Sequence, residues 1–333
     1  MVASMITAFP TICPNLQEIG LYHPPSDPTV AAAVSAMLFA TNRNTLRRFR
    51  VDCPLTHMAC EVISQLPNLW ELSVVIGSDT RLPSLVLPSL IDLTVTYSHG
   101  CGWLQGFRGA TLGNLASIAV RSESDSIGDF LEAFESVMLT TSTPGTLLMF
   151  RFHTSHPWRP NYRSLLPFTQ LTELTIDFSC EQDCSSTIDD DTIIDMARTM
   201  PTLELLQLGS QPCQTTTGVT AMGLAALAYY CSYLSTLRIH FQVDSLDRPS
   251  TSIITFGDQP IISRVDCALT KLEVGEIPIV EGSALMVALT LLRIFPCLQS
   301  IEYSDAGWED VAKAIELSKK LADASSKLSL TPL

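Results

Sequence analysis

Residues 66–76 read LPNLWELSVVI, and this stretch decides the fold of the chain. Pro67 is expected to end a helix, because proline lacks a backbone donor and clashes with the preceding helical turn. Leu69, Leu72 and Val74 then follow at the spacing of a short strand that buries one face. The stretch therefore predicts a helix end, a tight corner and a strand.

The same phrase recurs along the chain. The pattern Leu-x-x-(Leu/Ile/Phe)-x-(apolar) begins at eleven anchor leucines, which are Leu16, Leu46, Leu69, Leu90, Leu115, Leu147, Leu171, Leu203, Leu234, Leu269 and Leu298. Their average separation of about 28 residues lies at the long end of the range for leucine-rich repeats. Helix-like segments accompany most of these anchors, at residues 29–40, 56–66, 126–139, 191–200, 217–230, 283–295 and 308–321.

A strand and a helix of this size cannot close a core alone, so successive units must stack on one another. We therefore predict an α/β leucine-rich-repeat solenoid (horseshoe), formed by a single domain over residues 1–333. A parallel β-sheet would line its concave face, and helices and loops its convex face, in about eleven irregular repeats. The short steps around Leu69, Leu90 and Leu115 leave room on the convex side only for a loop or a single 3₁₀ turn.

Irregular inserts interrupt the pattern at residues 98–113, 153–167 and 179–188, and a long connection covers residues 244–265. Binding and catalytic residues often collect in such segments of a rigid scaffold. The inserts also suit the simpler interpretation of tolerated loops.

Composition narrows the class of protein. Apolar residues make up 46% and charged residues 16%, which is unlike a disordered chain. The net charge of −14, with no run of five or more Lys or Arg, would repel phosphate backbones, so no nucleic-acid partner is expected. The apolar runs at 219–231 and 284–295 are well short of the roughly 20 residues that span a bilayer, so no membrane partner is expected either.

The ten cysteines lie scattered through apolar stretches, and no secretory signal is evident at the N-terminus. Both observations favour reduced thiols and a location in the cytoplasm or nucleus. Residues 9–16 already read as the end of a helix and the start of a strand. We therefore expect the solenoid to lack its N-terminal cap or an upstream domain.

Four phrases carry a resemblance to a known family. They are LPNLxxLxV at 66–74, LPSLxxLxV at 87–95, MPTLxxLxL at 200–208 and FPCLxxI at 295–301. The chain resembles, over roughly residues 9–320, the repeat region of fungal F-box/leucine-rich-repeat proteins. The resemblance implies that the repeats recognise a target protein, while an F-box docks onto a cullin–RING ubiquitin ligase. No F-box-like segment is visible here, so docking on such a ligase would depend on a missing upstream F-box.

A second departure concerns the Asn or Cys that many leucine-rich repeats carry eight places after the first Leu. Those positions hold other residues here, namely Pro24, Pro54, Gly77, Ser98, Glu123, Ser155, Ser179, Gln211, Gln242, Ile277 and Ala306. The side-chain ladder that satisfies loop amides in regular repeats is therefore expected to be missing, and water or local turns would replace it.

Strand residues two, four and six places after each anchor should face away from the core. Arginine is the better cation for bidentate recognition of carboxylate or phosphate. Our candidates for partner contacts on this concave face are Arg48, Arg50, Arg121, Arg151, His153, Arg238 and His240. The alternative is that they are solvated strand residues paired with nearby carboxylates.

Other polar clusters do not indicate a metal, a cofactor or a catalytic centre. His153 and His156, or Cys180 and Cys184, lack a second ligand pair at structural-zinc spacing. The acidic run at 189–191 suits helix capping better than a calcium loop, which needs alternating ligands and a glycine. No nucleophile elbow, phosphate-binding loop or zinc-protease motif occurs, so we expect neither enzyme activity nor a cofactor.

The sequence is compatible with two functions. The first is a non-catalytic protein–protein interaction scaffold that grips its partner with the concave strands. The second is an enzyme regulator, similar to a ribonuclease inhibitor or a GTPase-activating solenoid, that acts through one surface patch.

Overall fold

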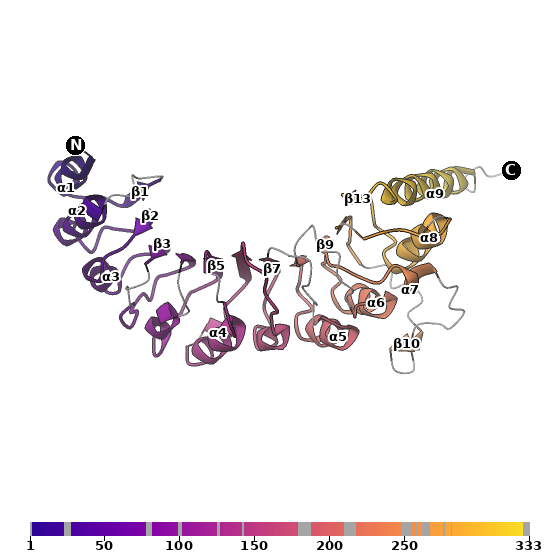
Figure 1. Ribbon diagram of the computed structural model, residues 1–333, viewed down its shortest axis with the longest axis horizontal. Helices are drawn as coiled ribbons and strands as arrows, with labels where there is room; N and C mark the ends of the chain where they lie inside the picture. Colours follow the sequence, from indigo (N-terminus) through magenta and orange to yellow (C-terminus); the bar gives the residue numbers. More distant parts are fainter. Residues whose placement is uncertain are drawn as a thin grey trace. The chain divides into compact units, whose positions relative to one another are not determined.

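The computed structural model describes residues 2–22, 28–77, 82–98, 102–124, 127–141, 143–178, 188–209, 218–247, 255–256, 259–260, 267–275, 277–280 and 282–328. The chain divides into two compact units, Met1–Leu171 (unit 1) and Thr172–Leu333 (unit 2). In each unit, parallel strands form a sheet and the helices lie along one face of it (Figure 1).

Unit 1 has six parallel strands, which pair in chain order. They are β1 (Glu18–Leu21), β2 (Arg48–Pro54), β3 (Glu71–Ile76), β4 (Asp92–Tyr97), β5 (Ser117–Ser122) and β6 (Met149–Thr154). Its helices are α1 (Val2–Ile12), α2 (Pro28–Ala40), α3 (His57–Ile63) and α4 (Phe130–Met138). Short 3₁₀ helices complete the connections, namely η1 (Gly102–Phe107), η2 (Thr143–Gly145) and η3 (Tyr162–Leu165).

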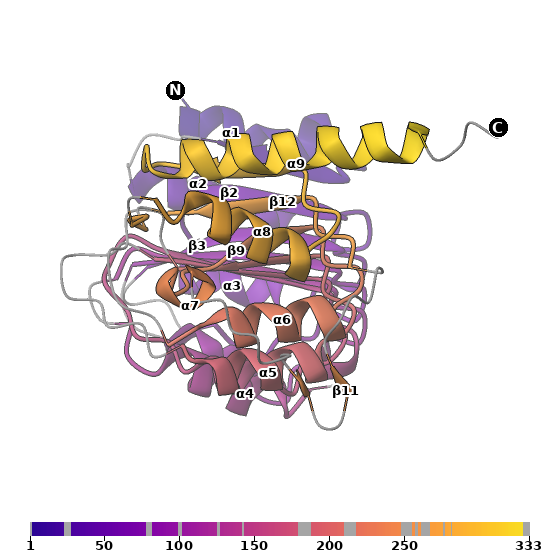
Figure 2. The same ribbon diagram turned by 90° about the vertical axis from the view of Figure 1, so that its right-hand side faces the viewer.

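Unit 2 repeats the arrangement with a sheet in the order β7, β8, β9, β12 and β13. These strands are β7 (Glu173–Phe178), β8 (Leu205–Leu208), β9 (Thr236–Arg238), β12 (Lys271–Val274) and β13 (Ser300–Tyr303). The helices are α5 (Asp190–Thr199), α6 (Ala221–Tyr230), α7 (Asp244–Asp247), α8 (Ala284–Ile294) and α9 (Trp308–Leu328), and Figure 2 shows α5, α6, α8 and α9 following one another. A separate antiparallel pair joins β10 (Thr255–Phe256) and β11 (Gln259–Pro260).

The anchor leucines predict where the strands begin. Each of the eleven anchors is followed, two residues later, by the first residue of a strand. All of them except the half-buried Leu16 are fully buried. This agreement confirms the coarser prediction of an α/β fold in which parallel strands alternate with helices.

The strand face that meets the helices forms the core. On β3, Leu72, Val74 and Ile76 are buried, whereas Glu71 and Ser73 are half-buried and point the other way. The alternation follows from the two-residue period of a strand, and it repeats on β4 and β7. Each repeat thus places one apolar row against the helices and one row toward solvent.

Aromatic side chains fill the layer between sheet and helices in unit 1. The ring of Phe130, at the start of α4, lies 4.6 Å from that of Phe152 and 5.9 Å from that of Phe134, measured between centroids. Trp158 packs against Phe152 at 4.6 Å and donates its indole N–H to the carbonyl of Gly128 at 3.0 Å. The cluster anchors α4 and the segment after β6 on the sheet.

The short repeats follow the prediction of a loop or a single 3₁₀ turn only in part. The connection before Leu115 holds η1, as predicted, whereas the connection before Leu69 holds the α-helix α3. Gly106 permits η1 to pack closely, because a Cβ atom there would lie 2.5 Å from the Cβ of Leu82 and 2.9 Å from its carbonyl oxygen. Of the other inserts, most of 179–188 and much of 244–265 lie outside the described residues.

Candidate functional site

We call the sheet face that points away from the helices the open face. In unit 1 it carries two groups of the predicted contact residues, one on β1–β3 and one on β5–β6. One residue of the second group differs from the arginines of the first, because Arg48 and Arg50 pair with carboxylates whereas Arg121 has no such partner among the described residues.

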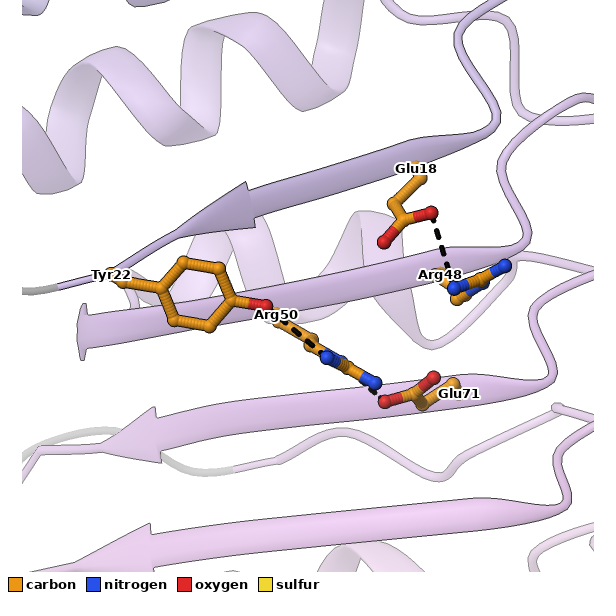
Figure 3. Close-up of polar contacts among 5 residues, drawn as sticks. All are labelled: Glu18, Tyr22, Arg48, Arg50 and Glu71. Atoms are coloured by element: carbon orange, nitrogen blue, oxygen red, sulfur yellow. Dashed lines mark hydrogen bonds and ion pairs between the residues drawn. The ribbon is translucent and has the colours of Figure 1, made fainter.

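The first group forms a network of two separate parts, each built on one arginine (Figure 3). Arg48 contacts Glu18 at 3.2 Å, while Arg50 donates to Glu71 and, at 3.2 Å, to the hydroxyl of Tyr22. The hydrogen bonds that Arg50 donates to Glu71 and Tyr22 raise the pKa of Arg50 above its ordinary value. The network matches the alternative interpretation, in which the strand arginines pair with nearby carboxylates.

The second group comprises Arg121, Arg151 and His153, and all three side chains are exposed. Strand register sets Arg121 directly beside His153, and Ala119 beside Arg151. Arg121 makes no hydrogen bond or ion pair with any other residue that the structure describes. The neighbours Ala119 and Thr94, which lie in register on β5 and β4, have small side chains.

Unit 2 holds the remaining two candidates, and neither is freely exposed. Arg238 retains 13% side-chain exposure and lies 3.5 Å from Asp177. His240 is only 7% exposed, which corrects the expectation that it faces solvent. The reason is local, since β9 ends at Arg238 and the alternation of a strand no longer governs the residues after it.

A similar correction applies to Glu273 on β12, which is buried although its position predicted exposure. Lys271 bridges it to Glu302, with contacts of 2.7 and 2.9 Å, and these hydrogen bonds raise the pKa of the lysine. The open face of unit 2 therefore has its own internal ion pairs.

A groove that the sequence did not predict runs along the edge of unit 1 at which the strands begin; we call it the edge groove. Its volume is about 640 Å³, and its lining residues are Gln17, Asn44, Thr45, Arg47, Asn68, Trp70, Ser89, Ile91 and Asn114. They form two rows, because Gln17, Arg47, Trp70 and Ile91 each come one residue after an anchor, and the others one or two residues before an anchor.

Hydrogen bonds hold the row before the anchors in place. Three of these side chains donate to a backbone carbonyl of the preceding repeat: Asn68 to Asn44 at 2.8 Å, Ser89 to Pro67 at 2.8 Å and Asn114 to Pro88 at 2.9 Å. A ladder of side chains was expected to be missing eight residues after each anchor, beyond the end of the strand. The structure instead has a ladder just before these anchors, where the strands begin. The signal that could have revealed this ladder is the Asn or Ser immediately before Leu69, Leu90 and Leu115.

The acidic run at 189–191 caps helices, as predicted. Asp189 accepts a hydrogen bond from the backbone N–H of Thr192 at 2.9 Å and so caps α5. Asp190 reaches the next helix, where it accepts from the N–H and hydroxyl of Thr220 and from the N–H of Gly223. The cluster thereby joins the starts of α5 and α6.

Among the described residues, no three His, Cys, Asp or Glu side chains are placed to hold a metal ion. Cys180 and Cys184 lie outside the described residues. Burial raises the pKa of the Cys60 thiol to about 11 and that of Cys231 to about 12, so both are protonated near neutral pH. In the part of the chain that the structure describes, no helix is long and apolar enough to cross a bilayer.

Neither a protein-family model nor a curated protein matches this chain.

Proposed function

We propose that this protein is a non-catalytic protein-interaction scaffold of the leucine-rich-repeat type, which binds its partner on the open face. The supporting observation is the group on β5 and β6, where Arg121, Arg151 and His153 stand exposed on adjacent strands. Arginines at a rigid, planar surface suit bidentate contacts with carboxylates of a partner. In an acidic protein such a cluster also offers a partner a local field of the opposite sign.

The paired network on β1–β3 supports the same assignment by contrast. Arg48 and Arg50 already have carboxylate partners on neighbouring strands, so a ligand would have to replace those contacts. Arg121 has no such contact among the described residues and is therefore the residue on which we place the most weight. In the finer form of the proposal, the scaffold serves as the substrate-recognition region of an F-box-type ubiquitin-ligase receptor.

Charge reversal tests the proposal. The double variant Arg121→Glu/Arg151→Glu is compared with Arg108→Glu/Arg163→Glu, which makes the same change in net charge at exposed residues of η3 and the turn after η1. Affinity purification with quantitative mass spectrometry should show partners that the first variant loses and the second retains. If both variants, shown to be folded by circular dichroism, recover the same proteins as the wild type, the open face is not the binding surface. Recovery of a cullin with the wild type would support the ligase form.

A further inference from the structure

The edge groove combines polar and apolar groups in a way that limits its ligand. One wall is the row of side-chain amides and hydroxyls at Asn68, Ser89 and Asn114, and the other carries Trp70 and Ile91. Arg47 and Gln17 extend the second wall, and no carboxylate lines the groove. This composition favours a ligand with both hydrogen-bond acceptors and apolar surface.

The amides are oriented before any ligand arrives. One N–H of Asn68 and one of Asn114 are committed to carbonyls of the preceding repeats, at 2.8 and 2.9 Å. A carboxamide has two donor hydrogens and one acceptor oxygen, so each of these side chains keeps one donor and its oxygen for a ligand. The remaining donor complements a backbone carbonyl, which every residue of a peptide offers, proline included.

Trp70 provides the apolar contact. Its indole is half-buried and lies between the groove and the open face, where the guanidinium of Arg48 is 4.9 Å from the ring centroid. Its indole N–H makes no hydrogen bond to another described residue and is available as a donor. Beside it, Ile91 is 42% exposed. An aromatic ring flanked by fixed donors is the arrangement on which proline-rich segments dock.

Spacing distinguishes between the possible peptide conformations. Register places Asn68, Ser89 and Asn114 in line, each three residues before equivalent positions of β3, β4 and β5. Two strand steps separate the two asparagines, which is about 9.6 Å. A polyproline II helix returns to the same orientation every three residues, after about 9.3 Å. A β-strand does so every two residues, after roughly 6.7 Å, and does not match.

We propose that the edge groove binds a proline-rich segment of a partner protein in the polyproline II conformation. Such a segment has no internal hydrogen bonds, so its carbonyls are free to accept from Asn68, Asn114 and the Trp70 indole. The groove spans four strand steps from Gln17 to Asn114, about 19 Å, which is the length of roughly six residues in this conformation. The inference deepens the proposed function, because it names the chemistry of one partner element and rests on the chain being a protein-binding scaffold.

The unmodified protein offers a direct readout. Of the four tryptophans, Trp103, Trp158 and Trp308 are buried and only Trp70 is half-exposed, so acrylamide should quench chiefly the emission of Trp70. A peptide of about nine prolines, longer than the groove, should protect this emission in a saturable manner. A Gly-Ser peptide of equal length, which lacks the preformed conformation, should not. Equal quenching with and without the proline peptide at millimolar concentration would overturn the inference.

Variants locate the binding site. With a dye-labelled proline peptide, fluorescence anisotropy should show about a tenfold loss of affinity for Trp70→Ala. Arg47→Ala removes a second donor from the wall without touching the ladder, and should weaken binding several-fold. The matched control is Tyr233→Ala, an exposed aromatic immediately before the anchor Leu234 in unit 2, and it should bind as the wild type does.

The two proposals fail separately. If the proline peptide does not bind while Arg121→Glu/Arg151→Glu still loses its partners, the groove inference is wrong and the scaffold function stands. If the peptide binds and responds to Trp70→Ala while the open-face variant recovers every partner, the groove stands and the open-face assignment is wrong. Binding that Trp70→Ala and Tyr233→Ala weaken equally would place the peptide elsewhere and overturn the groove.

Discussion

Asp190 offers the sharpest test of how one repeat supports the next in unit 2. The residue belongs to the first turn of α5, yet its carboxylate faces the start of α6. It accepts hydrogen bonds from the backbone N–H of Thr220 at 2.8 Å, from the Thr220 hydroxyl at 2.6 Å and from the N–H of Gly223 at 2.9 Å. Replacement by alanine leaves two backbone donors of α6 without this partner and removes a negative charge from the positive end of the helix dipole.

The magnitude follows from the number and kind of contacts. A hydrogen bond to a charged group contributes about 1.5–3 kcal/mol, and half-burial allows water to replace part of what is lost. Together with the dipole contribution, we expect Asp190→Ala to destabilise the local structure by about 3 kcal/mol. Opening of α6 should therefore become roughly a hundredfold more frequent. Hydrogen exchange measured by mass spectrometry over residues 221–230 reports this opening directly.

Asp191 supplies a matched control. It is the next residue in the same helical turn, it is exposed, and it makes no contact with α6 in the structure. Asp191→Ala should cost less than about 1 kcal/mol and leave exchange in α6 unchanged. Gly223→Ala should act in the same direction as Asp190→Ala, because a Cβ atom there would lie 2.6 Å from the Asp190 carboxylate. If Asp190→Ala and Asp191→Ala accelerated hydrogen exchange in α6 equally, or if α6 in Asp190→Ala exchanged as slowly as in the wild type, Asp190 would not hold the start of α6.

Two further predictions concern buried groups. Phe130→Ala should destabilise unit 1 by about 3–5 kcal/mol in urea denaturation, because the buried ring packs against Phe152. Leu139→Ala, at a 51% exposed position, should change stability by less than about 1 kcal/mol. Equal effects of the two variants would contradict a packing role for Phe130. Alkylation by iodoacetamide near pH 8, mapped by mass spectrometry, should modify the exposed Cys297 readily and leave Cys60 and Cys231 largely unmodified. The reason is that burial raises the pKa of the Cys60 and Cys231 thiols. Modification of all three cysteines at the same rate would contradict this prediction.

The positions of the strands could be predicted because their signal is local. Leu69 and the residues after it alternate with the period of a strand, and Pro67 stops the preceding helix, whatever the distant parts of the chain do. Capping by Asp189 was equally predictable, because an acidic residue just before an apolar helix has few other local uses. Such features depend on neighbours within a few residues, all of which the sequence displays.

The candidate site was less predictable because it depends on register between strands more than 20 residues apart. Arg50 and Arg121 occupy equivalent exposed rows, yet one meets Glu71 and Tyr22 on adjacent strands and the other stands beside His153. The exposure of His240 was predicted wrongly for a different reason. The alternation of buried and exposed residues holds only within a strand, and β9 ends at Arg238, before His240. Strand length and lateral neighbours are properties of the sheet, which a pattern read along one strand does not contain.

In the ladder of the edge groove, the residues just before each strand also form hydrogen bonds to the neighbouring repeat. In the short repeats of unit 1, a proline lies two residues before the anchors Leu69 and Leu90, and its carbonyl accepts a hydrogen bond from the side chain that precedes the next anchor, as Pro67 does from Ser89 and Pro88 from Asn114. The triplet of proline, small polar residue and leucine thus stops one segment, supplies an acceptor and supplies a donor. The acceptor two residues before an anchor need not be proline, since Asn44 accepts from Asn68, whereas Thr146 donates to the carbonyl of the anchor Leu115 itself, so the ladder changes register there. The regular spacing of the groove wall therefore depends on the same residues that set the strand starts, which is why the groove lies along the shortest repeats.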